Sequence, residues 1–380
     1  MRMESLPRHI AVLGDADLGF STQVLEGVQW FAGRTPGWRV VPLHCTQDDL
    51  LDDLLRNGRL SGVIGAFIST RWVASLPGQA VPLVNIGSLS EVTGVASVIP
   101  DHQAVGRLAA EHLVQGGWRV LGCLHEAASF AAMQQRAGFC GTAEASGATV
   151  SQPAASESFA PGANWEAWLR TLPQPAAVFC TSDRLARRLM ALLQQLTWRV
   201  PEQVAVVGVG DSAFESALAG MGISSVVLPG QRIGVRAAAR LQAMLEKGVV
   251  DQGVEALPPE TLVVRDSSAV VCSRDPVVSR AVGLMLQRPA GAALTATALA
   301  RQMGLSRRAL EVRFQRALGH GPATEMRRRR LWQVQRLLTG TDLSLEEIAA
   351  RTGFCGAHHL ATQFKRAMAC TPGTYRQRGR

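Results

Sequence analysis

The stretch LTATALARQMGLSRRALEVRFQRALG, residues 294–319, decides the fold of the C-terminal part of this chain. A helix is expected from about Thr297 to Gly304, because glycine readily adopts the left-handed turn that ends a helix. Ser306 then stands where a hydroxyl caps the start of the next helix. The stretch therefore predicts a helix, a tight turn and a second helix.

A second stretch, SLEEIAARTGFCGAHHLATQFKRAM (344–368), follows the same plan, with one helix from about Leu345 to Gly353 and another that carries His358 to Arg366. Residues 326–340 between the two units are expected to form a connecting helix. Apolar spacing predicts a small core in each unit and a buried side on the connecting helix. The expected core residues are Ala300, Leu305, Leu310 and Phe314 in the first unit, Ala349, Phe354, Leu360 and Phe364 in the second, and Leu331, Val334, Leu337 and Leu338 between them.

The first 265 or so residues have a different pattern, in which short Val-rich runs alternate with amphipathic stretches. The runs expected to be strands are IAVLGD (10–15), RVVPLH (39–44), GVIGAFI (62–68), VPLVNIG (81–87), RVLGCLH (119–125), AAVFCTSD (176–183) and VAVVGVGD (204–211). Stretches such as TQVLEGVQWFA (22–32), LLDDLLRN (50–57), GRLAAEHLVQ (106–115) and ARRLMALLQQL (186–196) read as helices between them. Continuous apolar strands joined by helices are typical of parallel sheets covered on both faces, so the fold class is α/β.

Three aspartates, Asp15, Asp183 and Asp211, fall where expected strands end. Ligands of open α/β sheets sit outside the carboxyl ends of the strands, which makes this edge the expected binding region. After residues 262–276 the strand-like runs disappear, and we place a boundary at Ser268 to Asp275. The expected domains are 1–268, which is α/β, and 274–380, which is all helical.

The charge is divided between these domains. Residues 274–380 hold 19 Lys and Arg against six Asp and Glu, a net charge of +13, whereas the remainder holds 20 against 24, a net charge of −4. Such asymmetry indicates a module that binds a polyanion, joined to a domain with another role.

Other features limit the classes of protein that are possible. The chain has 380 residues, 47% of them hydrophobic, which favours two or three globular units. Neither a signal peptide nor eighteen consecutive apolar residues are present, so we expect a cytoplasmic protein that does not bind membranes. The seven cysteines are scattered and contain no CxxC pair, which favours buried free thiols over disulfides or zinc. We expect no metal and no cofactor.

The helical part resembles the AraC-type DNA-binding domain over about 105 residues. The resemblance is carried, in order, by LSRRALEVRFQRALGHGP (305–322), RRLWQVQRLLTGTDLSLEEIA (329–349), GF (353–354), HHLATQFKRAM (358–368) and TPGTYR (371–376). It implies two recognition helices that enter successive major grooves of double-stranded DNA. The residues expected to face the bases are Arg307, Arg308, Glu311 and Val312 in the first unit and Ala357, His358, Ala361 and Thr362 in the second.

The chain departs from this family at two places. Val312 stands where relatives commonly have a polar or basic residue, and the second helix offers mostly small side chains, so base readout there depends on few contacts. Arg307 and Arg308 could each contact a base, contact phosphate or be solvated. Of the four arginines at 327–330, one or two are expected to approach phosphate, with the others solvated or paired.

The first part resembles the LacI-type effector domain, which is related to bacterial sugar-binding proteins. The motifs are VLEGVQWFA (24–32), DHQAVGRLAAEHLVQGG (101–117), VFCTSDRLARRLM (178–190), VPEQVAVVGVGDS (200–212) and ISSVVLPGQRIGVRAAARLQAML (223–245). The order of the two parts resembles that of xylose-operon activators. It implies a two-lobed domain that closes on a small effector, xylose or another sugar, in a homodimer that activates sugar-catabolism genes through RNA polymerase. The expected ligand-binding residues are Phe20, Ser21, Ser88, Gln135, Arg136, Asp183 and Asp211.

This family pattern is also broken at two positions. Gln135 stands where sugar-binding relatives often have arginine, and Gly210 stands where aspartate is usual, with Asp211 one position later. Either Arg136 and Asp211 substitute with a shifted geometry, or the ligand is not xylose. Asp211 could instead cap the following helix, and Asp183 is expected to be a cap or hinge residue more than a ligand group.

Two other classes of function agree less well with the sequence. An enzyme that acts on sugars would need a catalytic motif, yet no GxSxG, Walker loop or HExxH is present, and His125 at a strand end is more typical of a hydrogen-bonded structural residue. A sugar-binding protein without a regulatory role would leave the basic helical part unexplained. We therefore expect a DNA-binding regulator and not an enzyme.

Overall fold

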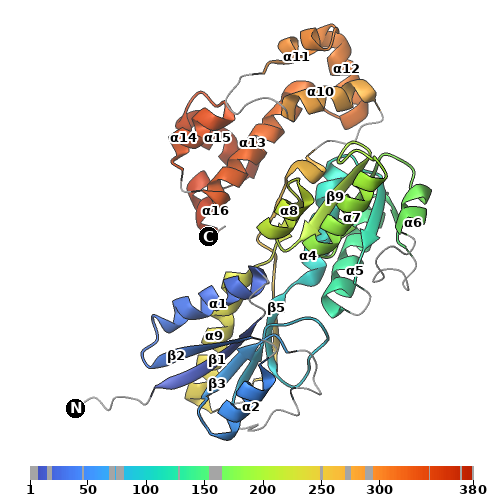
Figure 1. Cartoon of the computed structure of the whole chain (residues 1–380). Helices are drawn as coiled ribbons and strands as arrows, with labels where there is room; N and C mark the ends of the chain where they lie inside the picture. Colours follow the sequence, from blue (N-terminus) through green and yellow to red (C-terminus); the bar gives the residue numbers. More distant parts are fainter. Residues whose placement is uncertain are drawn as a thin grey trace.

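The computed structural model describes residues 7–14, 19–44, 47–67, 73, 81–126, 129–153, 165–248, 251–269, 275–286, 294–341, 343–368 and 370–378. Residues up to 269 form an α/β part with two lobes, and residues from 275 form a helical part (Figure 1). No helix among the described residues is long and apolar enough to cross a bilayer. Asp15 lies outside the described residues, as do residues 270–274, so the expected boundary between domains stays a prediction.

The first lobe is built on a six-stranded sheet with the order β11-β5-β4-β3-β1-β2. All its strand pairs are parallel. The strands are β1 Arg8–Gly14, β2 Trp38–His44, β3 Gly62–Gly65, β4 Leu83–Asn85, β5 Ala96–Pro100 and β11 Val254–Leu257. One face is covered by α1 Gly19–Ala32 and α9 Gly230–Lys247, and the other by α2 Asp48–Arg56. Because both faces are covered, the strands are apolar throughout, as the Val-rich runs predicted.

The second lobe repeats this plan with the order β12-β10-β9-β8-β6-β7. Its strands are β6 Val120–Leu124, β7 Thr149–Ser151, β8 Ala176–Cys180, β9 Val204–Val209, β10 Ser224–Val227 and β12 Thr261–Val263, of which β12 is antiparallel to β10. The helices α4 His102–Gln115 and α5 Phe130–Ala145 cover one face, and α6 Trp165–Thr171 and α7 Asp183–Gln195 cover the other. The short helix α8 Ala213–Ala219 packs beside α7.

The chain passes between the lobes three times. It crosses from β5 to α4, returns from β10 to α9, and crosses again from β11 to β12. The lobes also touch through the backbone, because the Phe130 N–H donates to Leu89 O at 2.8 Å and the Ala131 N–H to Ser88 O at 2.9 Å. The first turn of α5 leaves these N–H groups free of helical partners, so the loop after β4 satisfies them.

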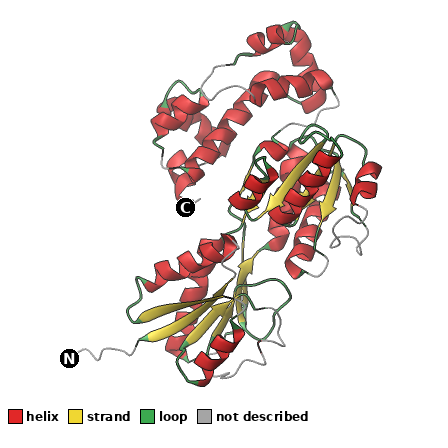
Figure 2. Cartoon of the chain, in the orientation of Figure 1, coloured by secondary structure: helices red, strands yellow, loops and turns green. Residues whose placement is uncertain are grey.

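The helical part contains two units joined by one long helix (Figure 2). The first unit holds α10 Pro276–Leu286, α11 Ala296–Gln302 and α12 Arg307–Leu318; α13 Pro322–Gly340 connects it to α14 Leu345–Thr352, α15 Ala357–Met368 and α16 Pro372–Arg378. Each unit has its own apolar core, and every expected core residue lies in it or packs against it. The expected helix ends are confirmed, because Gly304 and Gly353 have φ of +69° and +72°.

Each apolar run predicted as a strand in the α/β part contains one, and each predicted helix is present. The strands β5, β7, β10, β11 and β12 were not predicted. They are three to five residues long, and their sequences mix polar with apolar residues and so lack the continuous Val-rich runs by which the other strands were predicted.

Candidate nucleic-acid interface and effector site

The helices α12 and α15 are the second helices of the two helix-turn-helix units, and we expect them to be the recognition helices. Ser306 caps α12 as predicted, because its Oγ accepts the Ala309 N–H at 3.1 Å. The preceding helix of the other unit, α14, begins with a capping box, in which Ser344 and Glu347 bond to each other's backbone N–H. The Ser306 cap thus fixes the turn before α12, the Phe354 N–H, which donates to Ala349 O at 3.0 Å, fixes the turn before α15, and Leu310 and Phe364 anchor the helices in their cores.

The eight residues expected to face DNA lie in the N-terminal halves of α12 and α15, and none of them is buried. Arg307 is tied to its own helix, because its Nε donates to Glu311 Oε1 at 2.8 Å. Arg308 is exposed, and no bond to it is found in the described part of the chain. Val312 is 42% exposed, which suits contact with a thymine methyl group. On this geometry Arg308 is the stronger candidate for base readout, and Arg307 and Glu311 form a pair.

The second recognition helix presents His358 and Thr362 to solvent, with Ala357 and Ala361 half-buried beside them. The Thr362 hydroxyl donates to His358 O at 3.0 Å, so its oxygen remains able to accept a hydrogen bond from a base. Of the four residues expected to face DNA on this helix, two therefore have exposed polar side chains and two have small side chains.

Other basic residues of this part have structural roles. Arg329 pairs with the buried Glu325 at 2.7 Å and donates to Ala269 O at 2.9 Å, at the end of the α/β part. Of its neighbours, Arg327 and Arg328 are exposed. Arg376, in the TPGTYR motif, donates to Leu338 O at 3.3 Å and so satisfies a carbonyl in the last turn of α13.

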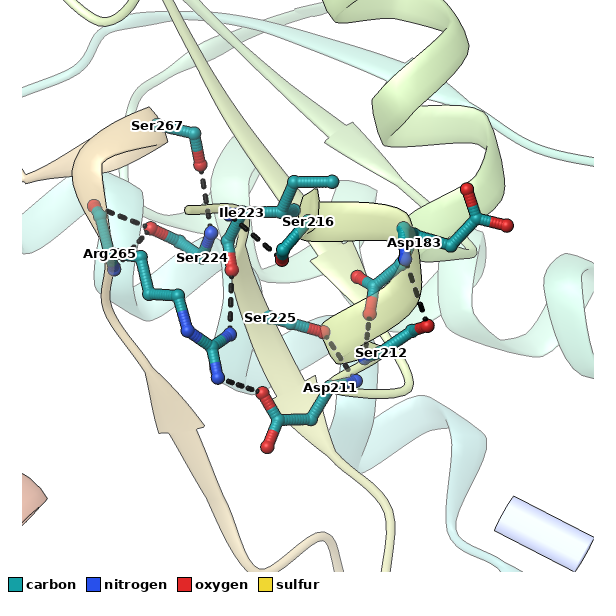
Figure 3. Close-up of polar contacts among 10 residues, drawn as sticks. Asp183, Asp211, Ser212, Ser216, Ile223, Ser224, Ser225, Arg265 and Ser267 are labelled. Atoms are coloured by element: carbon teal, nitrogen blue, oxygen red, sulfur yellow. Dashed lines mark hydrogen bonds and ion pairs between the residues drawn. The ribbon is translucent and has the colours of Figure 1, made fainter. Parts of the chain in front are cut away.

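The carboxyl edge of the second sheet carries two of the expected ligand residues of that lobe, Asp183 and Asp211, whereas Gln135 and Arg136 are in α5. Asp183 follows β8 and is buried, and its Oδ2 accepts the Ser212 N–H at 2.7 Å (Figure 3). A side chain at Gly208 in β9 would collide with it, since a Cβ there would lie 2.1 Å from Asp183 Oδ1. Burial raises the pKa of Asp183 to about 6, although the bond from Ser212 opposes that shift.

Asp211 is engaged elsewhere. Its carboxylate pairs with Arg265 and its N–H donates to Ser225 Oγ at 2.9 Å, whereas Ser212 caps α8. The proposed role of Asp211 as a helix cap is therefore wrong. Gly210 before it has φ of +119°, a conformation that side chains rarely adopt and glycine adopts readily.

Arg265 is held by a network that joins the end of the α/β part to its second sheet (Figure 3). The Arg265 guanidinium also donates to Ile223 O at 2.8 Å. The Arg265 N–H donates to Ser224 Oγ at 2.8 Å, and the Ser224 hydroxyl donates to Arg265 O at 3.0 Å. Ser267 completes the network, because its Oγ accepts the Ser224 N–H and donates to Val206 O.

Several buried polar side-chain atoms of the α/β part have no protein partner. Among the described residues they include Ser88 Oγ, His102 Nε2, His125 Nδ1, Gln135 Oε1, Arg136 Nε, Thr181 Oγ1 and Asp183 Oδ1. Buried polar atoms are rarely left unbonded, so each of these is available to water or a ligand. Thr181 and His125 directly follow β8 and β6, at the edge where the sequence predicted a site. The sequence treated His125 as structural and did not single out His102 or Thr181.

Gln135 is buried in α5 and contacts the first residue of α4, since its Nε2 lies 3.2 Å from His102 Nδ1. Burial lowers the pKa of His102 to about 4, so the ring is neutral at pH 7. Arg136 donates to Gln152 Oε1 at 2.8 Å and keeps its Nε free. In the first lobe, Phe20 and Ser21 open α1 and Ser88 follows β4, all half-buried. No cluster of metal-ligating side chains is found in the described part of the chain.

We predict different consequences for two substitutions in the helical part. Arg308→Ala removes an exposed side chain from the N-terminal half of α12, so it should cost about 1 to 3 kcal/mol of DNA-binding free energy and relax preference at one or two base positions. Arg316→Ala removes the same charge from the exposed C-terminal half of that helix. It should weaken binding to all DNA sequences by the same factor. Phe364→Ala should cost about 3 to 5 kcal/mol of folding free energy.

Melting curves and binding-site selection on these variants distinguish the roles. Arg308→Ala should keep the melting temperature of the parent protein. If Arg308→Ala unfolds the protein while Phe364→Ala changes only base preference, the assignment of helix faces is inverted.

Asp183 predicts a pH dependence of stability. Its pKa is about 6 in the folded chain against 3.8 as the ordinary value, so its protonated form favours folding. That contribution is complete below pH 4 and is lost as pH rises through 6. The side chain of Asp183→Asn stays neutral at every pH, so this variant does not lose that contribution. Between pH 4 and pH 7 the unfolding free energy of the parent protein should therefore fall by about 2 to 3 kcal/mol relative to that of the variant. The measurement is urea unfolding of both proteins at several pH values in this range. A constant difference in unfolding free energy between them would contradict the raised pKa of Asp183.

Comparisons with known proteins agree with both parts of this geometry. Residues 110–268 match the family model of periplasmic binding protein-like domains, and residues 299–378 match that of helix-turn-helix domains. The xylose operon regulatory protein of Escherichia coli strain K12 is 25% identical, over 97% of each chain. The HTH-type transcriptional regulator GlxA of Rhizobium meliloti is 40% identical over 24% of this chain and 28% of its own.

Among solved structures, that of the xylose-binding transcription activator xylR matches with a TM-score of 0.62 and 24% identity, over 99% of each chain. Residues 110–268 are therefore similar to periplasmic binding protein-like domains and residues 299–378 to helix-turn-helix domains, and the chain as a whole is similar to xylose operon regulatory proteins over 97% of its length.

Proposed function

We propose that this protein is a sequence-specific DNA-binding transcription regulator, controlled by a sugar held between the two lobes of its α/β part. The observation that carries the proposal is the pair of recognition helices, whose N-terminal halves are exposed in a part with a net charge of +13. Positive charge supplies affinity for phosphate, and the exposed helix faces supply base contacts. The similarity to xylose operon regulators over 97% of the chain supports this reading.

The proposed effector is a polyhydroxylated ligand, because of what the unpartnered atoms can bind. The pair of His102 and Gln135 presents one donor and one acceptor in either orientation of the amide. If the amide N–H donates to Nδ1, the ring keeps an Nε2–H donor and the amide oxygen is a free acceptor. If the ring Nδ1–H donates to the amide oxygen, the ring keeps Nε2 as an acceptor and the amide N–H is a free donor. A hydroxyl group satisfies both kinds of group. Thr181 and Asp183, which follow β8, add a hydroxyl and a carboxylate oxygen, and Arg136 in α5 adds a cation.

Asp211 has a different role in this proposal. Its pairing with Arg265 makes it part of the segment that leads toward the DNA-binding part, so it would respond to the ligand through the position of β9. We propose that sugar binding is read out through this segment, in a cytoplasmic homodimer that recruits RNA polymerase and activates sugar-catabolism genes. The proposal includes no catalytic role.

A thermal-shift screen against pentoses, hexoses and their acids tests the effector site. One neutral sugar should raise the melting temperature, since a ligand that binds only the folded state stabilises it by mass action. Gln135→Leu and Arg136→Ala should each weaken the binding of that sugar roughly tenfold or more, because each removes polar partners. Arg170→Ala, which removes an exposed arginine of the same lobe paired with Glu166, is the matched control and should bind normally.

The same sugar should change the affinity of the full chain for promoter DNA in a gel-shift titration, with no turnover of the sugar. A sugar response that all three variants retain would mean that the site is elsewhere. A sugar that is consumed, or that leaves DNA affinity unchanged, would contradict the proposed regulator.

A further inference from the structure

Two cysteines of the second lobe lie in contact beneath one face of its sheet. Cys123 in β6 is fully buried, and Cys140 in α5 is half-buried. Both belong to the core between this face and helices α4 and α5, where each thiol lies near enough to shift the pKa of the other. Cys140 is therefore the more exposed of the two residues, whereas Cys123 is enclosed by the core.

The other described cysteines are placed differently. Cys180 in β8 is in register with Leu124, the residue after Cys123, and neighbouring residues of a strand point to opposite faces. Cys355 and Cys370 lie in the helical part, and Cys355 is exposed. Among the described residues, Cys123 and Cys140 are thus a pair that the fold itself brings together.

Polar groups on α5 and beyond it favour a negative charge on Cys140. Gln152 Nε2 donates to Cys140 Sγ at 3.4 Å. Arg136, one helical turn before Cys140, donates to Oε1 of the same Gln152 side chain. The hydrogen bond from Cys123 lowers the pKa of Cys140, as does the Arg136 guanidinium, while burial and Glu144 oppose them. The pKa of Cys123 is raised well above its ordinary value by that same hydrogen bond and by burial. The two thiols are therefore unequal, with Cys140 suited to attack and Cys123 suited to remain protonated until a partner is formed.

We propose that Cys140 and Cys123 form an oxidation site that hydrogen peroxide converts into a disulfide between β6 and α5. The Cys140 thiolate attacks one peroxide oxygen and the O–O bond breaks, which gives a sulfenic acid and a hydroxide that takes up a proton to become water. Cys123 Sγ then attacks the sulfenic sulfur; the S–S bond forms, the S–O bond breaks, and a second water leaves with the Cys123 proton. Two thiols are oxidised by two electrons and one peroxide is reduced to two waters.

The disulfide would connect the sheet to the helix that carries Gln135 and Arg136. Disulfides in reducing compartments are usually transient and serve in sensing or catalysis, so this bond is a reversible modification and not a structural crosslink. The site is independent of the proposed function, because its chemistry needs neither DNA nor a sugar.

The test treats the reduced full-length protein, at low concentration, with hydrogen peroxide, followed by alkylation and peptide mapping. The main product should be a Cys123–Cys140 disulfide with the loss of two hydrogen atoms, reversed by dithiothreitol. Cys355 is the reference thiol in the same sample and should react several-fold more slowly. In Cys123→Ala, Cys140 should stop at a sulfenic acid that dimedone traps; in Cys140→Ser, Cys123 should stay reduced.

Arg136→Gln provides a second readout, because it should slow the oxidation of Cys140 and leave that of Cys355 unchanged. The proposal is overturned if Cys140 in the parent protein reacts no faster than Cys355, ends as a sulfinic acid, or pairs with a cysteine other than Cys123. An unreactive Cys140 would overturn it equally.

Discussion

Each part of the chain buries a hydrophobic core of its own, and the rest of the structure depends on this independence. The α/β part encloses four cores on the two faces of its two sheets, and the helical part encloses one in each helix-turn-helix unit. Because neither part needs the other to remove apolar surface from water, the surface of each is free for binding. The polar edge of the second sheet and the exposed halves of α12 and α15 are these free surfaces, with acidic and basic charge separated between the two parts.

The junction between the parts is made by a few specific contacts. Arg265 fixes the segment after β12 to the Asp211 carboxylate, after β9, and to Ile223 O, directly before β10. Further along, Arg329 reaches back to Ala269 O, and the Tyr375 hydroxyl of α16 bonds with Thr261 in β12. A ligand that moves the carboxyl ends of β8 and β9 would thus act on a segment that the DNA-binding part touches directly. Coupling of this kind needs two arrangements of the junction, one of which each ligand favours.

The sequence predicted the parts of this account that depend on local pattern. Helix ends at Gly304 and Gly353, the cap at Ser306 and both small cores follow from spacings of a few residues, and all are present. The contacts that define the candidate effector site join residues far apart in the chain, such as Arg265 with Asp211 and His102 with Gln135. No spacing rule connects such residues, since only the order of strands in the sheet and the packing of α4 on α5 bring them together. For the same reason the sequence left open whether Asp211 caps a helix, and treated Cys123 and Cys140 only as scattered thiols.

The most direct test of the central claim, that DNA binding resides in the helical part alone, compares two fragments. Residues 274–380 and residues 1–268 are expressed separately, and their affinities for promoter DNA are measured by fluorescence anisotropy over a series of salt concentrations. Residues 274–380 should bind with an affinity that falls steeply with salt, because arginines that contact phosphate release counterions, and residues 1–268 should not bind. Binding by residues 1–268, or binding by residues 274–380 that does not change with salt, would contradict the account.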